Sequence, residues 1–206
     1  MNIITISREF GSGGREIGKR LADLLGYDYY DRQIIQEIAQ NKGLSEEFVE
    51  KSLDASPWQT LNLNYRSSFY GVSLMPTMST ELLLEERNVL EEIAKKGRDC
   101  VIVGRNADIV PEDYHPFSIF VCAERDAKLK RCRERASEEE ELSDKEMISY
   151  FKRIDRNRAA TRELISDSKW GDPTSYTLTV NTTGWDLKEL TPALAAFAKA
   201  WFEKTE

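Results

Sequence analysis

The sequence is poor in residues that bind metals or form cross-links: it has one histidine and three cysteines in 206 residues. The cysteines, Cys100, Cys122 and Cys132, lack the paired spacing of a zinc site. With only His115 to join them, the composition argues against structural zinc. Cys100 and Cys122 belong to apolar stretches typical of strands, and we expect both thiols to be buried.

Long apolar runs are also lacking. No segment approaches the ~20 apolar residues that a membrane-spanning helix needs, so we expect no contact with a membrane. The chain begins on a strand pattern without a basic and then apolar leader, which predicts a cytoplasmic protein. A net charge of -7 argues against a protein that coats nucleic acid or an anionic surface.

What the sequence does have is a regular alternation of strand and helix patterns. Five runs rich in apolar residues predict strands, at residues 3–6, 27–31, 100–104, 117–122 and 176–181. Helical spacing of apolar or charged residues predicts helices at 17–25, 32–40, from 45, 81–96, 125–135, 147–164 and 187–202. This alternation predicts an α/β fold with about five strands in a mostly parallel sheet flanked by helices.

One long stretch, residues 54–80, shows neither period and is rich in aromatic side chains. A stretch of this length is either an insert that covers a substrate or loosely ordered. Its aromatic residues Trp58, Tyr65, Phe69 and Tyr70 suit a pocket for a base and a dimer contact equally well, and both interpretations stay open.

A glycine-rich turn, Gly-Ser-Gly-Gly at residues 11–14, separates the first strand from the first helix. Such a turn can direct backbone N–H groups and the positive end of the helix dipole at a phosphate, as a P-loop does. The usual P-loop ends Gly-Lys-Ser/Thr, whereas Gly13 is followed here by Gly14 and Arg15. A tight connection without a ligand is the alternative interpretation.

Two arginines beside the turn, Arg8 and Arg15, favour a phosphate site. Two cations crowd the positive end of a helix unless an anion binds between them. Arg15 can also replace the missing lysine, because a guanidinium group binds phosphate in bidentate fashion.

A second cluster of positive charge comprises Arg153, Arg156, Arg158 and Arg162, with Asp155 the single acid among them. On a helix, Arg158 and Arg162 lie one turn apart, and Arg153 and Arg156 are neighbours in the same way. An exposed helix with salt bridges is the alternative interpretation, although one acid cannot neutralise four arginines. Phosphoryl transfer needs cations around the moving group, so the cluster predicts a phosphate-handling segment.

Asp31 and Arg105 each follow a predicted strand. Ligands of parallel sheets bind at the carboxyl ends of the strands, which places both residues near the turn. A helix N-cap is the alternative interpretation for Asp31, and a plain surface position is the alternative for Arg105.

These stretches, in this order over nearly the whole chain, resemble the nucleoside monophosphate kinases, most closely the cytidylate kinase-like group. Residues 4–17 resemble the variant P-loop of that group, and Tyr29-Tyr30-Asp31 resembles the start of its monophosphate-binding segment. Val101-Ile102-Val103-Gly104-Arg105 resembles its Gly-Arg strand end, and Asp155-Arg156-Asn157-Arg158-Ala159 its lid sequence.

The resemblance implies one P-loop kinase domain over residues 1–206, with a monophosphate-binding insert and an arginine-rich lid. Its expected parts are a P-loop and second strand (1–41), an acceptor-side insert (42–80), a core (81–135), a lid region (136–172) and a last strand and helix (173–206). The implied reaction transfers a phosphoryl group from ATP, with Mg²⁺, to a nucleoside monophosphate such as CMP or dCMP.

The resemblance also implies roles for individual residues. The donor phosphates would bind Gly11, Ser12, Gly13, Gly14, Arg15 and Glu16, and the donor base would lie against Arg131. The acceptor would bind Asp31, Arg105, Asp155 and Arg158, and the catalytic cations would be Arg15, Arg153, Arg156, Arg158 and Arg162. No general base is needed, because an acceptor phosphate is already nucleophilic.

The chain departs from the cytidylate kinase pattern at five positions. Gly14 replaces the lysine, Arg15 the second glycine, Glu16 the metal-binding hydroxyl, Val103 an acid and Asn106 an aspartate. The sequence therefore identifies no Mg²⁺ ligand and leaves a second hypothesis open, a nucleotide-binding regulator or pseudokinase with the same fold. It also leaves open whether the protein is a monomer or a homodimer.

Overall fold

The computed structural model describes residues 1–54, 78–104, 106–107, 114–135 and 142–205. Its sheet has five parallel strands in the order β2-β3-β1-β4-β5. The strands are β1 (Ile3–Arg8), β2 (Asp28–Tyr30), β3 (Cys100–Val103), β4 (Phe117–Cys122) and β5 (Leu178–Asn181). This confirms the predicted α/β class and the five parallel strands.

The central strand β1 is buried on both faces because helices cover both sides of the sheet. Ile3, Ile4 and Ile6 are inaccessible to solvent. Ile3 packs in one cluster with residues of α2, α3 and α5, while Ile4 and Ile6 pack in a second cluster with residues of α1 and α8. A continuous β-branched run, without polar alternation, is what a strand in such a sheet requires.

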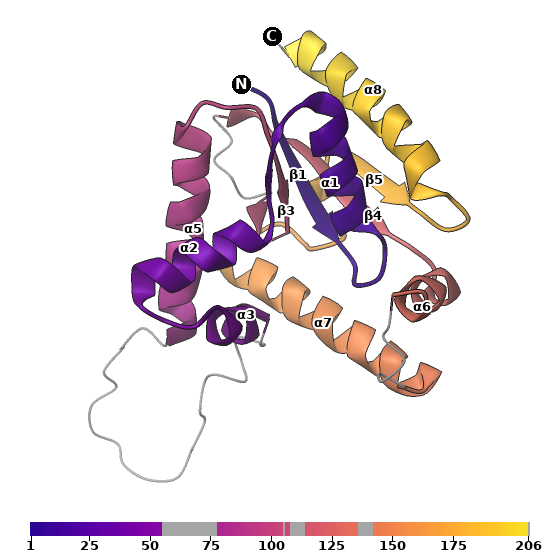
Figure 1. The fold of residues 1–206 in the computed structure, drawn as a ribbon, viewed down its shortest axis with the longest axis horizontal. Helices are drawn as coiled ribbons and strands as arrows, with labels where there is room; N and C mark the ends of the chain where they lie inside the picture. The colour runs from indigo at the N-terminus through magenta and orange to yellow at the C-terminus, as the bar shows by residue number, and fades with distance from the viewer. Residues whose placement is uncertain (55–77, 105, 108–113, 136–141, 206) are drawn as a thin grey trace.

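The helices form two layers and a third group at one end of the sheet (Figure 1). Helices α1 (Gly14–Leu25) and α8 (Leu187–Thr205) cover one face, and α2 (Arg32–Lys42), α3 (Glu46–Asp54) and α5 (Met78–Lys95) cover the other. Helices α6 (Arg125–Arg133) and α7 (Asp144–Ile165) lie near the carboxyl end of β1. The fold therefore collects α6, α7 and the glycine-rich turn at one edge.

Helix α7 begins three residues earlier than its apolar spacing predicts. Ser143 caps it, because its hydroxyl accepts from the N–H of Glu146 while the Glu146 carboxylate accepts from the N–H of Ser143. This reciprocal pair is a capping box. The Ser-x-x-Glu pattern was present in the sequence and locates the helix start better than apolar spacing does.

The thiols differ from the expectation at one position. Cys100 is buried, as predicted, and burial raises its pKa to about 12. Cys122 is only half-buried, because it is the last residue of β4 at the open end of the sheet. Its thiol donates to the carbonyl of Val180 at 3.5 Å. Both thiols are free, as is that of Cys132.

The aromatic stretch predicted as an acceptor-side insert lies largely outside the described residues, which resume at α5. Within the part of the chain that is described, no helix is both long and apolar enough to span a membrane.

Candidate functional site

The turn between β1 and α1 depends on glycine at two positions. Gly11 and Gly13 have φ angles of 74° and 89°, in the left-handed region that favours glycine. A Cβ on Gly13 would lie 2.6 Å from Cδ1 of Leu187, the first residue of α8. Gly13 is therefore required by its backbone conformation and by the close approach of α8.

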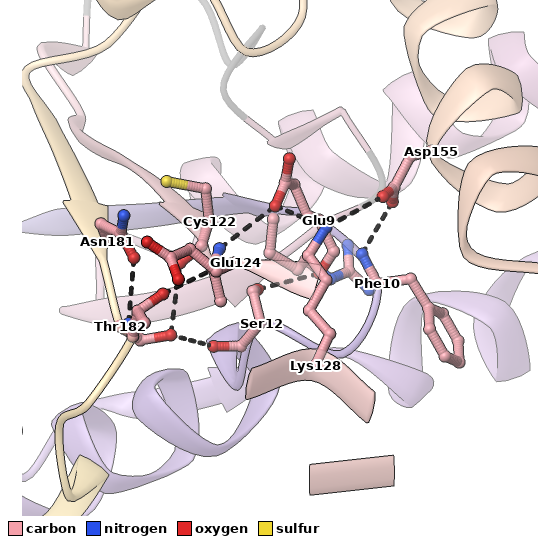
Figure 2. Close-up of polar contacts among 12 residues, drawn as sticks. Glu9, Phe10, Ser12, Cys122, Glu124, Lys128, Asp155, Asn181 and Thr182 are labelled. Carbon is pink, nitrogen blue, oxygen red and sulfur yellow. Dashed lines mark hydrogen bonds and ion pairs between the residues drawn. The ribbon is translucent and has the colours of Figure 1, made fainter. Parts of the chain in front are cut away.

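One outer side of the turn is held by β5 and α6. The carbonyl of Ser12 accepts from the hydroxyl of Thr182 at 2.7 Å and from Nη1 of Arg131 at 3.2 Å. Arg131 also donates to the hydroxyl and the carbonyl of Thr182, at 3.0 and 2.6 Å. The Ser12 hydroxyl donates to the carbonyl of Glu9 at 2.9 Å. Figure 2 shows Ser12 and Thr182 facing each other in this arrangement.

The other outer side is held by α7. Oδ1 of Asp155 accepts from the N–H of Phe10 at 2.7 Å, and Nη1 of Arg158 donates to the carbonyl of Arg8 at 2.9 Å. Phe10 also stacks on Phe151, with 5.3 Å between ring centroids. The predicted lid helix is therefore fastened to the start of the turn.

An ion-pair network joins α6, α7 and the turn. Nζ of Lys128 lies 2.6 Å from Oε2 of Glu9 and 3.6 Å from Oδ2 of Asp155 (Figure 2). Burial raises the pKa of Asp155, although its contacts with Phe10, Arg158 and Lys128 favour the carboxylate. Desolvation thus outweighs pairing at this carboxyl group.

On the inner side of the turn, which faces away from these contacts, several backbone N–H groups are left without partners in the described part of the chain. Five backbone N–H groups have no hydrogen-bond acceptor among the described residues. They belong to Gly11, Gly13, Gly14, Arg15 and Glu16. A free N–H is ordinary in the first turn of a helix, but Gly11 and Gly13 precede α1. These groups and the helix dipole form a donor set that suits a phosphate.

Asp31 lies between the two arginines that flank the turn. Its Oδ2 is 2.6 Å from Nε of Arg15, and its Oδ1 is 4.0 Å from Nη2 of Arg8. Asp31 is 5% exposed and occupies the N-cap position of α2, but its side chain makes no capping hydrogen bond. The carboxylate therefore pairs with the arginines and does not cap the helix. Arg15 points toward Asp31, on the predicted acceptor side.

A cavity of about 40 Å³ opens at the carboxyl ends of β1 and β3. Its walls come from Ser7, Arg8, Leu53, Glu86, Gly104, Asn106, Arg158, Thr161 and Trp170. Arg8 and Arg158 both line it, and Arg8 packs against Gly14 of the glycine-rich turn. Such a pair of cations suits an anionic group of a substrate.

The four arginines of α7 do not act as one group. Arg158 lies on the face with Asp155 and contacts the turn. Arg162 is 3% exposed on that face, donates to the Ser168 hydroxyl at 2.8 Å and lies 5.9 Å from the ring centroid of Tyr176.

Arg153 and Arg156 lie exposed on the opposite face of α7, and Arg153 stacks on the ring of Tyr150 at 5.1 Å. The structure thus brings only Arg158 of the four to the turn. Arg105, predicted to bind the acceptor, lies outside the described residues.

The residue at the position of the usual metal-binding hydroxyl does not fit a Mg²⁺ ligand as it stands. Glu16 has the oxygen chemistry that Mg²⁺ prefers. However, its Oε1 pairs with Nε of Arg20 at 2.8 Å, and its Oε2 pairs with Arg135. No cluster of three or more metal-binding side chains occurs in the described ranges.

Three contact residues were not predicted from the sequence, although patterns for them exist. Lys128 lies one helical turn before Arg131 and therefore on the same face of α6. Thr182 directly follows β5, at the same carboxyl edge as Asp31. Glu9 carried no signal, because its role depends on how α6 packs against the turn.

Comparison with known proteins agrees with this fold. The sequence model of the cytidylate kinase-like family matches residues 3–184. No curated protein matches the chain. Among solved structures, an uncharacterized protein from Eubacterium ventriosum has a TM-score of 0.70 and 23% sequence identity, and the similarity covers 97% of this chain and 99% of that one.

Two shikimate kinases share the fold at lower similarity. The enzyme from Bacteroides thetaiotaomicron has a TM-score of 0.56 and 14% identity, with 96% of this chain and 98% of that chain covered. The enzyme from Acinetobacter baumannii, solved in complex with shikimate, has a TM-score of 0.55 and 13% identity, with 97% and 94% covered. At these identities the likeness shows the fold alone, which is that of the P-loop kinases.

Proposed function

The chain belongs to the cytidylate kinase-like family, and from this premise we propose that it transfers the γ-phosphoryl group of ATP to a nucleoside monophosphate, CMP or dCMP first among them. Membership and fold support a nucleotide-dependent kinase in general. One observation carries the proposal: five N–H groups of the turn and of α1 have no acceptor in the described structure, and Arg8, which packs against Gly14 of the turn, lines a cavity together with Arg158.

On the donor side, the N–H groups from Gly11 to Glu16 would bind the phosphates of ATP. Arg131 would contact the donor base, as the family resemblance implies. Its guanidinium edge already donates to Ser12 and Thr182, and those hydrogen bonds lie in the plane of the group. A base stacked on the face of the guanidinium leaves these bonds intact.

On the acceptor side, Asp31, Arg105, Asp155 and Arg158 would position the monophosphate. An oxygen of the acceptor phosphate attacks the γ-phosphorus, while the bond from that phosphorus to the bridging oxygen breaks. The protein contributes position and positive charge, because no proton has to be removed from the nucleophile.

The catalytic cations divide by location. Arg158 lines the cavity, and Arg15 pairs with Asp31, which also lies near Arg8 in the cavity wall. Arg153 and Arg156 would join only after a movement of α7, since both are exposed. Arg162 would act as a positioning residue, because its guanidinium is buried against Ser168 and Tyr176.

A regulator that binds nucleotide with little turnover is the second candidate. It is favoured by the turn itself, where Gly14 replaces the lysine and the carboxylate of Glu16 is engaged by Arg20 and Arg135. Such a protein would bind ATP or ADP and release little or no product.

A coupled assay of ADP release tests the proposal, with ATP, Mg²⁺ and a panel of CMP, dCMP, UMP, AMP and GMP. We expect turnover with the cytidine nucleotides, strongly reduced in Arg158→Ala and Arg15→Ala. Arg98→Ala is the control, because this exposed arginine pairs with Asp28 at the opposite end of the sheet. Nucleotide binding by calorimetry without turnover on any acceptor would support the regulator, and absence of binding would exclude both.

A further inference from the structure

The turn departs from the usual phosphate-binding pattern in two reciprocal ways. In Gly-x-x-x-x-Gly-Lys, the first glycine stands five residues before the second, and lysine follows the second. With Gly13 as the second glycine, position 8 is arginine where the pattern has glycine, and position 14 is glycine where it has lysine. The positive charge has changed places with a glycine within one loop.

The structure shows why the two changes belong together. A Cβ on Gly14 would lie 2.6 Å from Cβ and 3.1 Å from Cγ of Arg8. These atoms are close to the backbone of β1 and cannot move aside as the end of a flexible side chain can. Arg8 therefore occupies the space in which a lysine at position 14 would begin, and the two side chains exclude each other.

The side chain of Arg8 extends from β1 over Gly104, at the end of β3, to the cavity wall. Its Nη1 lies 1.3 Å from the position that a Cβ on Gly104 would take, so the glycine at the end of β3 makes room for it. Its Nη2 lies 4.0 Å from Oδ1 of Asp31, and the side chain lines the cavity that Arg158 also lines. The group is thus held between the turn and the predicted acceptor side.

We propose that Arg8 replaces the P-loop lysine as the cation that contacts the terminal phosphates of the donor. This inference rests on the proposed function, because it assigns a residue to the same reaction. During transfer, the acceptor oxygen bonds to the γ-phosphorus as the bond to the bridging oxygen breaks. Arg8 stabilises the charge on the equatorial oxygens through its two parallel N–H groups and gives up no proton.

Arg15 is the competing replacement, since it is the cation predicted from the sequence. Its side chain is 61% exposed, whereas that of Arg8 is 12% exposed, and its Nε is paired with Asp31 at 2.6 Å. Arg8 is the better placed group because it is already desolvated and fixed at the cavity. A fixed cation loses less conformational freedom when phosphate binds.

Calorimetric titration with tripolyphosphate compares the two arginines without relying on turnover. We expect Arg8→Gln to weaken binding at least about tenfold, the value of a hydrogen bond to a charged group. Arg15→Gln should weaken it less, and the control Arg98→Gln should match the wild type. Wild-type affinity in Arg8→Gln, or a larger loss in Arg15→Gln, would overturn the assignment.

The reciprocal exchange gives the sharper test. We expect Gly14→Lys alone to lower the thermal unfolding temperature, because its Cβ meets Arg8. The double variant Arg8→Gly with Gly14→Lys should have a higher unfolding temperature than Gly14→Lys alone. It should also bind tripolyphosphate more tightly than Arg8→Gly alone. A double variant that binds no better than Arg8→Gly would overturn the inference, as would a Gly14→Lys protein as stable as the wild type.

Failure of the proposed function gives a different result. If the wild type binds tripolyphosphate but turns over no acceptor, the kinase proposal fails while the ranking of Arg8 and Arg15 still decides the inference. If the wild type does not bind tripolyphosphate at all, both are overturned.

Discussion

The glycine-rich turn and helix α7 are the two regions that the sequence marks for phosphate, and the structure prepares them differently. In the turn, groups on the outer side are bound by β5, α6 and α7, and five N–H groups inside have no acceptor among the described residues. In α7, one arginine contacts the turn, one is buried, and two are exposed.

This difference shows how each region can contribute to transfer. Backbone donors held from outside need no reorganisation when a phosphate binds, and they lose no side-chain entropy. The arginines of α7 have long side chains, and the positions of their guanidinium groups depend on the position of the helix. The contacts of Asp155 and Arg158 with Phe10 and Arg8 are what join the two regions.

The largest effect should follow a change inside the turn. We expect Gly13→Ala to abolish tripolyphosphate binding and to lower the free energy of unfolding. The left-handed backbone costs about 1–2 kcal/mol in a residue with a Cβ, and the clash with Leu187 adds about 1–3 kcal/mol. Urea unfolding and calorimetry measure the two effects.

Gly97→Ala is the matched control, because Gly97 also has a positive φ, of 68°, but a Cβ there would meet nothing within 4 Å. It should show only the backbone cost and normal phosphate binding. Equal losses in both variants would mean that the close approach of α8 to the turn is unimportant.

The next largest effect should separate the two faces of α7. We expect Arg158→Gln to lower kcat by about 10²–10³, as loss of a fixed transition-state donor does. Arg156→Gln should lower it by about tenfold or less, because an exposed side chain contributes only after α7 moves. Steady-state kinetics with a saturating acceptor measure both, and a larger loss in Arg156→Gln would reverse the comparison.

The smallest effect concerns the carboxylate that joins the two regions. The pKa of Asp155 is raised in the folded protein because burial disfavours the charged form. A carboxyl with a raised pKa contributes stability below its unfolded value, near 3.8, and loses this contribution as the pH rises through its folded pKa. Asp155→Asn removes that titration.

Thermal unfolding of the wild type and Asp155→Asn across acid to neutral pH checks the sign. The stability of the wild type relative to the variant should fall as the pH rises through this window and then become constant. A relative stability that increases with pH would show that pairing with Lys128 and Arg158 outweighs burial.

Much of the fold followed from local patterns in the sequence. Buried β-branched runs such as Ile3–Ile6 identify strands between helices, and Gly26 ends α1 with a φ of 71°, as its position after Leu25 predicts. Of the candidate site, the sequence identified the turn and the need for cations near it. It grouped the α7 arginines into two pairs but not by their surroundings, because spacing shows which residues share a helix face and not which face meets the core.

The sequence by itself determined the alternating strands and helices, the glycines of the turn and the missing lysine, since each depends on residues adjacent in the chain. Only the tertiary structure decided that Arg8 fills the space above Gly14 and extends over Gly104 to the cavity. That outcome depends on how β1, β3 and α1 meet. Distances between elements far apart in the chain are fixed by packing, which no local pattern records.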